Sequence, residues 1–264
     1  MAQDIYICSD IHGRLTEYQE ALKRVGNNRL YILGDCIDRH PDGVTILLDI
    51  MHRDNVTLLM GNHEWMMFNS LFAEQKQMDI WCSPNNGGVV TLRSLMHAID
   101  EKKVTLKEFC DFLLSCPLFV DFGGVYLCHG MPHFALFDAD FDKEVASFDK
   151  PHIYTLQDGI NDNINPEYIH IMVWHSVFKD IYEIQHLEQT RKVKTTVYSG
   201  HVIDVYSDVP NSTEDGLPIS VTNDGMLTCI DIDGGCAFPF DLGYDGHLNL
   251  LNITKGTYER IESK

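Results

Sequence analysis

Short apolar runs alternate with amphipathic segments over the first sixty residues. Ile5–Cys8, Leu30–Leu33 and Val56–Met60 are almost wholly apolar, which is typical of strands buried on both faces. The order strand, helix, strand, helix, strand predicts parallel β-α-β units, whose ligand sites lie beyond the carboxyl ends of the strands. The two segments between the runs space their apolar residues as one face of a helix does, namely Leu15, Tyr18, Leu22 and Val25, then Val44, Leu47, Leu48 and Met51.

Capping residues mark where these and later helices begin and end. Gly26 is placed to cap the end of the first helix, and Asp42 to cap the start of the second. Residues 64–116 are expected to be mainly helical, and Thr105 and Glu108 there have the spacing of a capping box. Three residues of this stretch are expected to share one helical face: Val89, Leu92 and Met96.

Strand patterns return in the second half of the chain, separated by turns rich in Gly, Pro and Asn. Residues 130–170 and 202–225 are long and poorly patterned, and such loops are often functional, although 208–218 also fits an acidic surface loop. Because no Pro/Ser linker divides the chain, we expect a single domain, 1–264. The predicted strands are Leu118–Phe122, Val125–Cys128, Thr195–Ser199, Met226–Asp231 and Leu248–Ile253.

Charge and cysteine usage exclude some classes of partner. The chain has 20 Lys plus Arg against 39 Asp plus Glu, a formal charge of -19, so nucleic acid and acidic membranes should be repelled. No apolar run approaches the roughly 18 residues that a membrane span needs. The eight cysteines include no C-x-x-C pair and several lie in apolar runs, which indicates reduced thiols and a cytoplasmic location.

Polar residues that can bind metals or move protons stand just after five of the predicted strands. Any one of them has an ordinary structural explanation, but five successive strand ends do not. Oxygen and imidazole donors without thiolate suit Mn, Fe or Zn, and a carboxylate can bridge two such ions about 3.5–4 Å apart. Asp35, which is central in this order, is the predicted bridge. The full set is Asp10, His12, Asp35, Asn62, His63, His129 and His201.

The motifs around these residues carry a family resemblance that spans almost the whole chain. They resemble the phosphoprotein-phosphatase family of calcineurin-like metallophosphoesterases, and within it the small bacterial and phage serine/threonine phosphatases and the symmetrical dinucleoside tetraphosphatases. The three leading motifs are Ser9–Gly13, Gly34–Arg39 and Gly61–Glu64, and the later ones are Trp81 with Asn86-Gly87-Gly88, Cys128–Gly130, Ser199–His201, Cys229–Asp231 and Asp245–Leu248.

The resemblance implies an α/β metallophosphoesterase (calcineurin-like) fold, with a central two-sheet β-sandwich flanked by helices. It also implies two divalent metal ions, with manganese expected and iron or zinc as alternatives. One ion would be held by Asp10, His12 and Asp35. The other would be held by Asp35, Asn62, His129 and His201.

The same resemblance assigns the proton transfer and the binding of phosphate. His63 would donate a proton to the leaving oxygen with help from Asp38, while Arg39 and Asn62 would bind the phosphate. General chemistry agrees, because an imidazole with a carboxylate partner is a suitable acid and a guanidinium matches phosphate oxygens in a fork.

The chain also departs from the family pattern. Ser9 and His40 replace glycines beside ligand positions, and His40 either narrows the pocket or points to solvent. Trp174-His175-Ser176 lacks the arginine that related small phosphatases carry close behind the tryptophan. His175, Arg191 or Lys179 could take its place, so the departure concerns substrate and rate more than metal binding.

The sequence therefore predicts two-metal hydrolysis of phosphomonoesters, with phosphoserine or phosphothreonine in proteins as the expected substrate. A symmetrical dinucleoside tetraphosphate hydrolase is the alternative enzyme, and a non-catalytic metal-dependent binding module is the alternative of another class. The expected partners are phosphorylated proteins or small phosphoesters, without nucleic acid or membrane. The sequence does not fix the oligomeric state.

Overall fold

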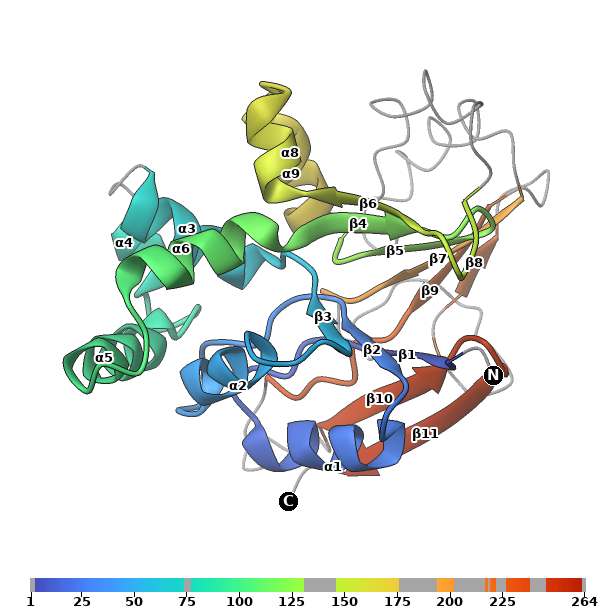
Figure 1. The fold of residues 1–264 in the computed structure, drawn as a ribbon, viewed down its shortest axis with the longest axis horizontal. Helices are drawn as coiled ribbons and strands as arrows, with labels where there is room; N and C mark the ends of the chain where they lie inside the picture. The colour runs from blue at the N-terminus through green and yellow to red at the C-terminus, as the bar shows by residue number, and fades with distance from the viewer. Residues whose placement is uncertain are drawn as a thin grey trace.

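Two β-sheets form the centre of the chain (Figure 1). The computed structural model describes residues 3–73, 77–130, 146–175, 194–201, 217, 219–221, 227–237 and 246–262. The first sheet has the strand order β11-β10-β1-β2-β3, and the second has the order β6-β4-β5-β7-β9-β8.

The first sheet is built around the three apolar runs at the start of the chain. β1 is parallel to β2 and β2 to β3, whereas β10 is antiparallel to both β1 and β11. Helices α1 (Leu15–Val25) and α2 (Gly43–Ile50) make the crossovers that parallel pairing requires. The strands are β1 (Ile5–Cys8), β2 (Arg29–Ile32), β3 (Val56–Leu58), β10 (His247–Asn252) and β11 (Thr257–Glu262).

The second sheet comes mostly from the second half of the chain. β5, β7 and β9 are parallel neighbours, and β4, β6 and β8 pair antiparallel to their neighbours at the two sides. The strands are β4 (Pro117–Asp121), β5 (Val125–Cys128), β6 (His152–Thr155), β7 (Thr195–Ser199), β8 (Ile219–Val221) and β9 (Leu227–Asp231).

The remaining helices flank the sheets in two groups. The helices α3 to α6 gather at one end of the molecule, and α8 and α9 lie against β6 and β4 (Figure 1). They are α3 (Asn62–Phe72), α4 (Met78–Trp81), α5 (Gly88–Asp100), α6 (Leu106–Ser115), α8 (Leu156–Asn161) and α9 (Pro166–Trp174). No helix of the described residues is long and apolar enough to cross a membrane.

Side chains alternate across the first sheet and so divide the core in two. Ile5 and Ile7 of β1 pack with Val120 and Leu127 of the second sheet, while Cys8 faces the cluster that the helices cover. Because successive strand residues point to opposite faces, one face of the first sheet meets the second sheet and the other meets helices. The predicted two-sheet α/β architecture flanked by helices is confirmed.

The two regions expected to be long loops contain regular structure where they are described. Residues 146–170 include β6, α8 and the start of α9, and β8 lies within 202–225. The local signals were present: the Thr155 hydroxyl accepts from the Asp158 N–H at 3.1 Å, and Asn165 precedes a proline at the first turn of α9. The expectation of irregular loops was therefore wrong for these segments, while 131–145 and 202–216 lie outside the described residues.

Two details of the predicted helices also differ from the structure. Asp42 precedes α2 but makes no side-chain capping hydrogen bond, whereas the Thr105–Glu108 capping box of α6 is present. In α5 the fully buried residues include Thr91, Leu95 and Ala98, while on the expected apolar face Leu92 is partly buried against the core and Met96 is 52% exposed. The apolar pattern therefore missed Thr91, a polar residue on the buried face.

Candidate functional site

The carboxyl ends of β1, β2, β3, β5 and β7 bring the predicted site residues together. Short turns after these strands carry the residues in strained backbone: of the eight described non-glycine residues with positive φ, six belong to the predicted site. Left-handed backbone costs energy for residues other than glycine and is concentrated at functional sites. These six are Asp10 (φ 55°), His12 (47°), Asp35 (54°), Asp38 (69°), Arg39 (66°) and His201 (76°).

Asp35 lies at the centre of the cluster, as its place in the sequence suggests. Its Oδ2 is 3.7 Å from His12 Nε2 and 3.8 Å from His63 Nε2, and its Oδ1 is 3.5 Å from His129 Nε2. These separations are long for direct hydrogen bonds. The carboxylate and the imidazoles therefore surround a shared space and do not hydrogen-bond directly to one another.

Asn62 joins the two histidines that the second sheet contributes. Its Oδ1 is 2.9 Å from His129 Nε2 and 3.0 Å from His201 Nδ1. The other nitrogen of the His129 ring, Nδ1, lies 2.6 Å from the Leu33 carbonyl, and that oxygen can only accept. With the ring proton on Nδ1, His129 Nε2 and Asn62 Oδ1 present lone pairs to the same point, as two ligands of one cation do.

The charge balance of the site also fits a bound cation. Burial raises the pKa of Asp10 well above its usual range, and the nearby charge of Asp233 raises it further. Burial, followed by the charge of Asp10, does the same for the pKa of Asp35. Burial lowers the pKa of His12 and His129 well below the usual value, so these rings are neutral donors. Crowded buried carboxylates beside neutral imidazoles suit divalent ions.

Two groups of described residues could each hold an ion, with ligand atoms within 4.8 Å of one another. One group combines Asp35 with His12 and His63, and the other combines Asp35 with His129 and His201. Asp10 belongs to neither group, and its Oδ2 accepts hydrogen bonds from Ser9 Oγ and, at 3.1 Å, from the His201 N–H. The carboxylate nevertheless lies beside the site, buried with the others.

His63 and Asp38 form a buried pair next to the carboxylate of Asp35. His63 Nδ1 is 2.7 Å from Asp38 Oδ2, and Arg39 Nη2 is 3.5 Å from His63 Nε2. Burial lowers the pKa of His63, and the guanidinium of Arg39 also lowers it, while the hydrogen bond and charge of Asp38 raise it. The arrangement fixes one ring nitrogen on a carboxylate and leaves the other beside a guanidinium.

Glu64 is a site residue that the sequence did not single out, although it closes the motif Gly61–Glu64. Its carboxylate accepts backbone N–H groups of Asp35 (2.8 Å), Cys36 (2.8 Å) and Gly61 (3.1 Å). Burial raises its pKa to about 7, against the effect of these hydrogen bonds. The side chain thus ties the turn after β2 to the start of α3. Its place in the first turn of a helix was the available signal.

The rim of the site is partly described. Trp174 is half-buried and lies edge-on to the His201 ring, with centroids 6.0 Å apart, and His175 caps the end of α9. Ser176, Arg191 and Lys179 lie outside the described residues. His40 is half-buried and its Nε2 atom is buried, so the ring does not simply point to solvent.

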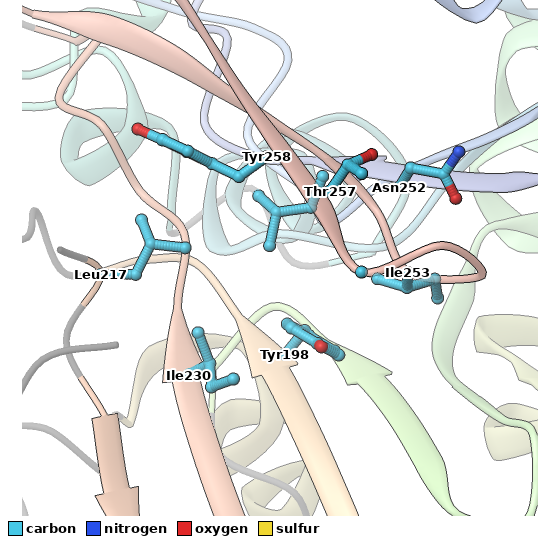
Figure 2. A pocket seen from close by; sticks show the side chains of 9 residues that line it. Tyr198, Leu217, Ile230, Asn252, Ile253, Thr257 and Tyr258 are labelled. Carbon is cyan, nitrogen blue, oxygen red and sulfur yellow. The ribbon is translucent and has the colours of Figure 1, made fainter. Parts of the chain in front are cut away.

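A cavity of about 100 Å³ lies away from these residues (Figure 2). Tyr198 of β7 and Ile230 of β9 face the connection between β10 and β11, where Ile253 lies in the turn and Thr257 begins β11. Its lining is mainly apolar and includes none of the predicted site residues. The strand-end cluster therefore remains the candidate for chemistry.

Comparison with known proteins agrees with this architecture. The family model of the calcineurin-like phosphoesterases matches residues 4–204, and the chain belongs to that family. A Caenorhabditis elegans protein, named as a putative serine/threonine-protein phosphatase, is 34% identical over 77 residues, which cover 26% of this chain and 21% of that relative.

Solved structures show the same fold at low sequence identity. A protein named as a putative diadenosine tetraphosphatase has a TM-score of 0.50 and 16% identity, over 100% of this chain and 95% of its own. A metallophosphoesterase from Sphaerobacter thermophilus has a TM-score of 0.51 and 15% identity, over 100% and 90%. A cold-active protein-tyrosine phosphatase from a Shewanella species has a TM-score of 0.51 and 18% identity, over 99% and 81%.

The family to which the chain belongs is one of metal-dependent phosphoester hydrolases. The family uses divalent metal ions, and the two groups of side chains that share Asp35 are of the kind that could bind them.

Proposed function

We propose that the chain hydrolyses phosphomonoesters with two divalent metal ions, and that phosphoserine or phosphothreonine in proteins is its substrate. The observation that supports this most directly is the position of Asp35, whose two oxygens face imidazoles from both sheets at 3.5–3.8 Å. A carboxylate in that position can serve two ions at once. The proposed ligands are Asp10, His12, Asp35, Asn62, His129 and His201.

When bound, the ions would supply an activated water and stabilise negative charge on the phosphoryl oxygens. Backbone carbonyl groups of the chain orient the histidine ligands. The Ile37 carbonyl holds His12 Nδ1 at 2.9 Å, and the Leu33 carbonyl holds His129 Nδ1, so the Nε2 atoms of both rings turn to the site. Oxygen and imidazole donors without thiolate suit manganese, iron and zinc alike, and manganese is the metal that we propose from the family resemblance.

His63 is the proposed proton donor, and Arg39 and Asn62 are the proposed phosphate-binding residues. Arg39 Nη2 lies 3.5 Å from His63 Nε2, so a phosphate bound by this guanidinium also lies beside the imidazole. Burial lowers the pKa of His63 in the free protein. A bound phosphate dianion would favour the protonated ring, since an opposite charge stabilises the charged form of a group.

All eight cysteines are free thiols, which supports a reducing compartment such as the cytoplasm. The match of the family model over residues 4–204, followed by two strands of the first sheet, supports a single domain over 1–264.

The test is an assay of the protein reconstituted with Mn²⁺ against three substrates: a phosphoserine peptide, p-nitrophenyl phosphate and diadenosine tetraphosphate. We expect turnover of the peptide and the aryl phosphate with two metal ions per chain, and none after chelation. Preference for the dinucleotide would replace the proposal with the tetraphosphatase. Two bound ions without turnover of any substrate would leave a binding module.

A further inference from the structure

The carboxylate of Asp38 is held by two side chains that are neither proposed metal ligands nor proposed catalytic residues, Trp81 and Thr91. Asp38 is 0% exposed, and besides His63 its Oδ2 accepts a hydrogen bond from Trp81 Nε1 at 2.8 Å. Its Oδ1 accepts one from Thr91 Oγ1 at 2.6 Å. Trp81 ends α4 and Thr91 lies in the first turns of α5, so the two donors stand on either side of Asn86-Gly87-Gly88 in the chain.

The Thr91 hydroxyl acts on Asp38 twice. It donates to the carboxylate and accepts the Asp38 backbone N–H at 3.0 Å. Asp38 has a φ of 69°, which is left-handed backbone that an aspartate adopts at a cost. One buried hydroxyl therefore fixes the backbone and the side chain of the same residue. A valine at position 91 would keep the shape and lose both contacts.

The paired glycines allow this segment to approach the site closely. A Cβ on Gly87, whose φ is 76°, would lie 2.8 Å from the Arg39 backbone nitrogen. A Cβ on Gly88 would lie 2.6 Å from Trp81 Nε1. Both distances are shorter than real Cβ contacts, so side chains here would push the turn away from Arg39 and move the indole. Asn86 closes the turn through a hydrogen bond to the Ile80 carbonyl at 2.9 Å.

We infer that Trp81 and Thr91 are positioning residues that act through Asp38 to aim His63 at the leaving oxygen of the substrate. The inference rests on the proposed function, in which His63 is the acid. In that step water attacks phosphorus, the bond from phosphorus to the leaving oxygen breaks with its electron pair on oxygen, and His63 gives that oxygen a proton from Nε2. Asp38 must keep Nδ1 in place throughout.

The direction of the hydrogen bonds explains why two donors matter. A carboxylate held by His63 alone can rotate and carry the imidazole with it. With Trp81 and Thr91 each donating to a different oxygen, the plane of the carboxylate is fixed and so is the ring that it holds. Both donors are neutral, so the segment orients Asp38 without neutralising it.

The decisive experiment compares leaving groups in Thr91→Val and Trp81→Phe, both reconstituted with Mn²⁺. Phenyl phosphate needs an acid to protonate its leaving oxygen, whereas 2,4-dinitrophenyl phosphate does not. We expect kcat for phenyl phosphate to fall by about 10–100-fold, a part of what a general acid contributes. For the dinitrophenyl ester we expect a change below about threefold, with KM and metal content unchanged. Thr91→Ser, which keeps the hydroxyl, should restore the original ratio.

Thr105→Val is the matched control, because it removes an exposed threonine hydroxyl that caps a helix away from Asp38. Thr105 caps α6 through its contact with the Glu108 N–H at 3.2 Å and has no contact with Asp38. It should lower the melting temperature and leave the ratio between the two esters unchanged. An equal loss for both esters in Thr91→Val, or the same change of ratio in Thr105→Val, would overturn the inference.

A second measurement separates this inference from the proposed function, because it needs no turnover. In ¹⁵N-labelled metal-free protein, the proton on His63 Nδ1 should give a downfield signal, identified by its absence in His63→Asn. We expect that signal to move or vanish in Thr91→Val and Trp81→Phe and to stay in Thr105→Val. An unchanged signal in the first two variants contradicts positioning through Asp38, whether or not the wild-type protein hydrolyses any ester.

Discussion

The two sheets contribute to the site in different ways. The turns after β1, β2 and β3 carry proposed ligands, the acid pair and the phosphate anchor, and backbone hydrogen bonds join the first two of these turns. The Asp10 N–H donates to Gly34 at 3.2 Å, and the His12 N–H donates to Asp35 at 2.9 Å. From the second sheet come His129 and His201, and one backbone bond, from Gly200 to the His129 carbonyl at 2.9 Å, connects their strand ends.

This difference indicates that the first-sheet side sets the shape of the site as well as binding, whereas the second-sheet side contributes mainly to binding. On the first-sheet side, the Glu64 carboxylate accepts the Asp35 N–H and the Asp35 carboxylate accepts the His63 N–H, so side chains cross-link the turns after β2 and β3. On the second-sheet side, His201 is half-buried and reaches the cluster through Asn62 and Asp10. Changes on the first side should therefore disturb geometry and binding together, whereas changes at His201 should be local.

Asp35→Asn should have the largest effect, because this carboxylate faces imidazoles from both sides. An amide keeps the shape but removes the charge that would bridge two ions, so we expect loss of both metals and a fall in kcat/KM of at least about a thousandfold. Metal analysis after gel filtration and the aryl phosphate assay measure this. Two retained ions in Asp35→Asn would show that the two sides bind metal independently.

His63→Asn should slow turnover while the metals stay. The His63 imidazole lies on Asp38 and beside Arg39, and its loss removes the proposed proton donor, so kcat should fall by about 10²–10⁴-fold. Metal content and KM for p-nitrophenyl phosphate are the accompanying measurements. Loss of one ion in this variant would make His63 a ligand, in line with its place in one of the two possible metal groups.

His201→Asn tests whether the second-sheet side contributes to metal binding without contributing to stability. We expect one of the two ions to be lost or bound more weakly, and kcat to fall by roughly 10²-fold. This loss of activity exceeds the usual effect of removing a residue that only hydrogen-bonds to a metal ligand. The melting temperature of the metal-free protein should stay unchanged, because few backbone contacts depend on this side chain. Unfolding of the metal-free variant would show that both sides are structural.

Glu64→Gln should give the smallest change in activity but a measurable change in stability. The glutamine has one acceptor oxygen for three N–H donors, so metal affinity should fall by roughly tenfold and the free energy of unfolding by about 1–3 kcal/mol. Glu108→Gln, at the exposed capping box of α6, is the matched control and should change only stability, by less. Equal effects in both variants would argue against a special role for Glu64.

Local sequence patterns predicted the first strands and the capped start of α6 well. The apolar runs of β1, β2 and β3 were visible because strands buried on both faces are apolar throughout, and the capping box at Thr105 was visible because it is a contact over three residues. The α8 segment carried an equally local signal, Thr155 with Asp158, but lay in a stretch whose Gly and Asn residues suggested a loop.

The sequence by itself determined the fold class and the set of chemical groups at the strand ends, because parallel strands bring their carboxyl ends to one edge wherever the chain goes next. Only the tertiary structure decided which groups touch. Trp81 and Thr91 meet Asp38 from 43 and 53 residues away, and Glu64 meets Asp35 from 29. Thr91 looks like an ordinary helix residue in the sequence, and only packing of α5 against the site gives its hydroxyl a partner, because contacts over such separations leave no local pattern.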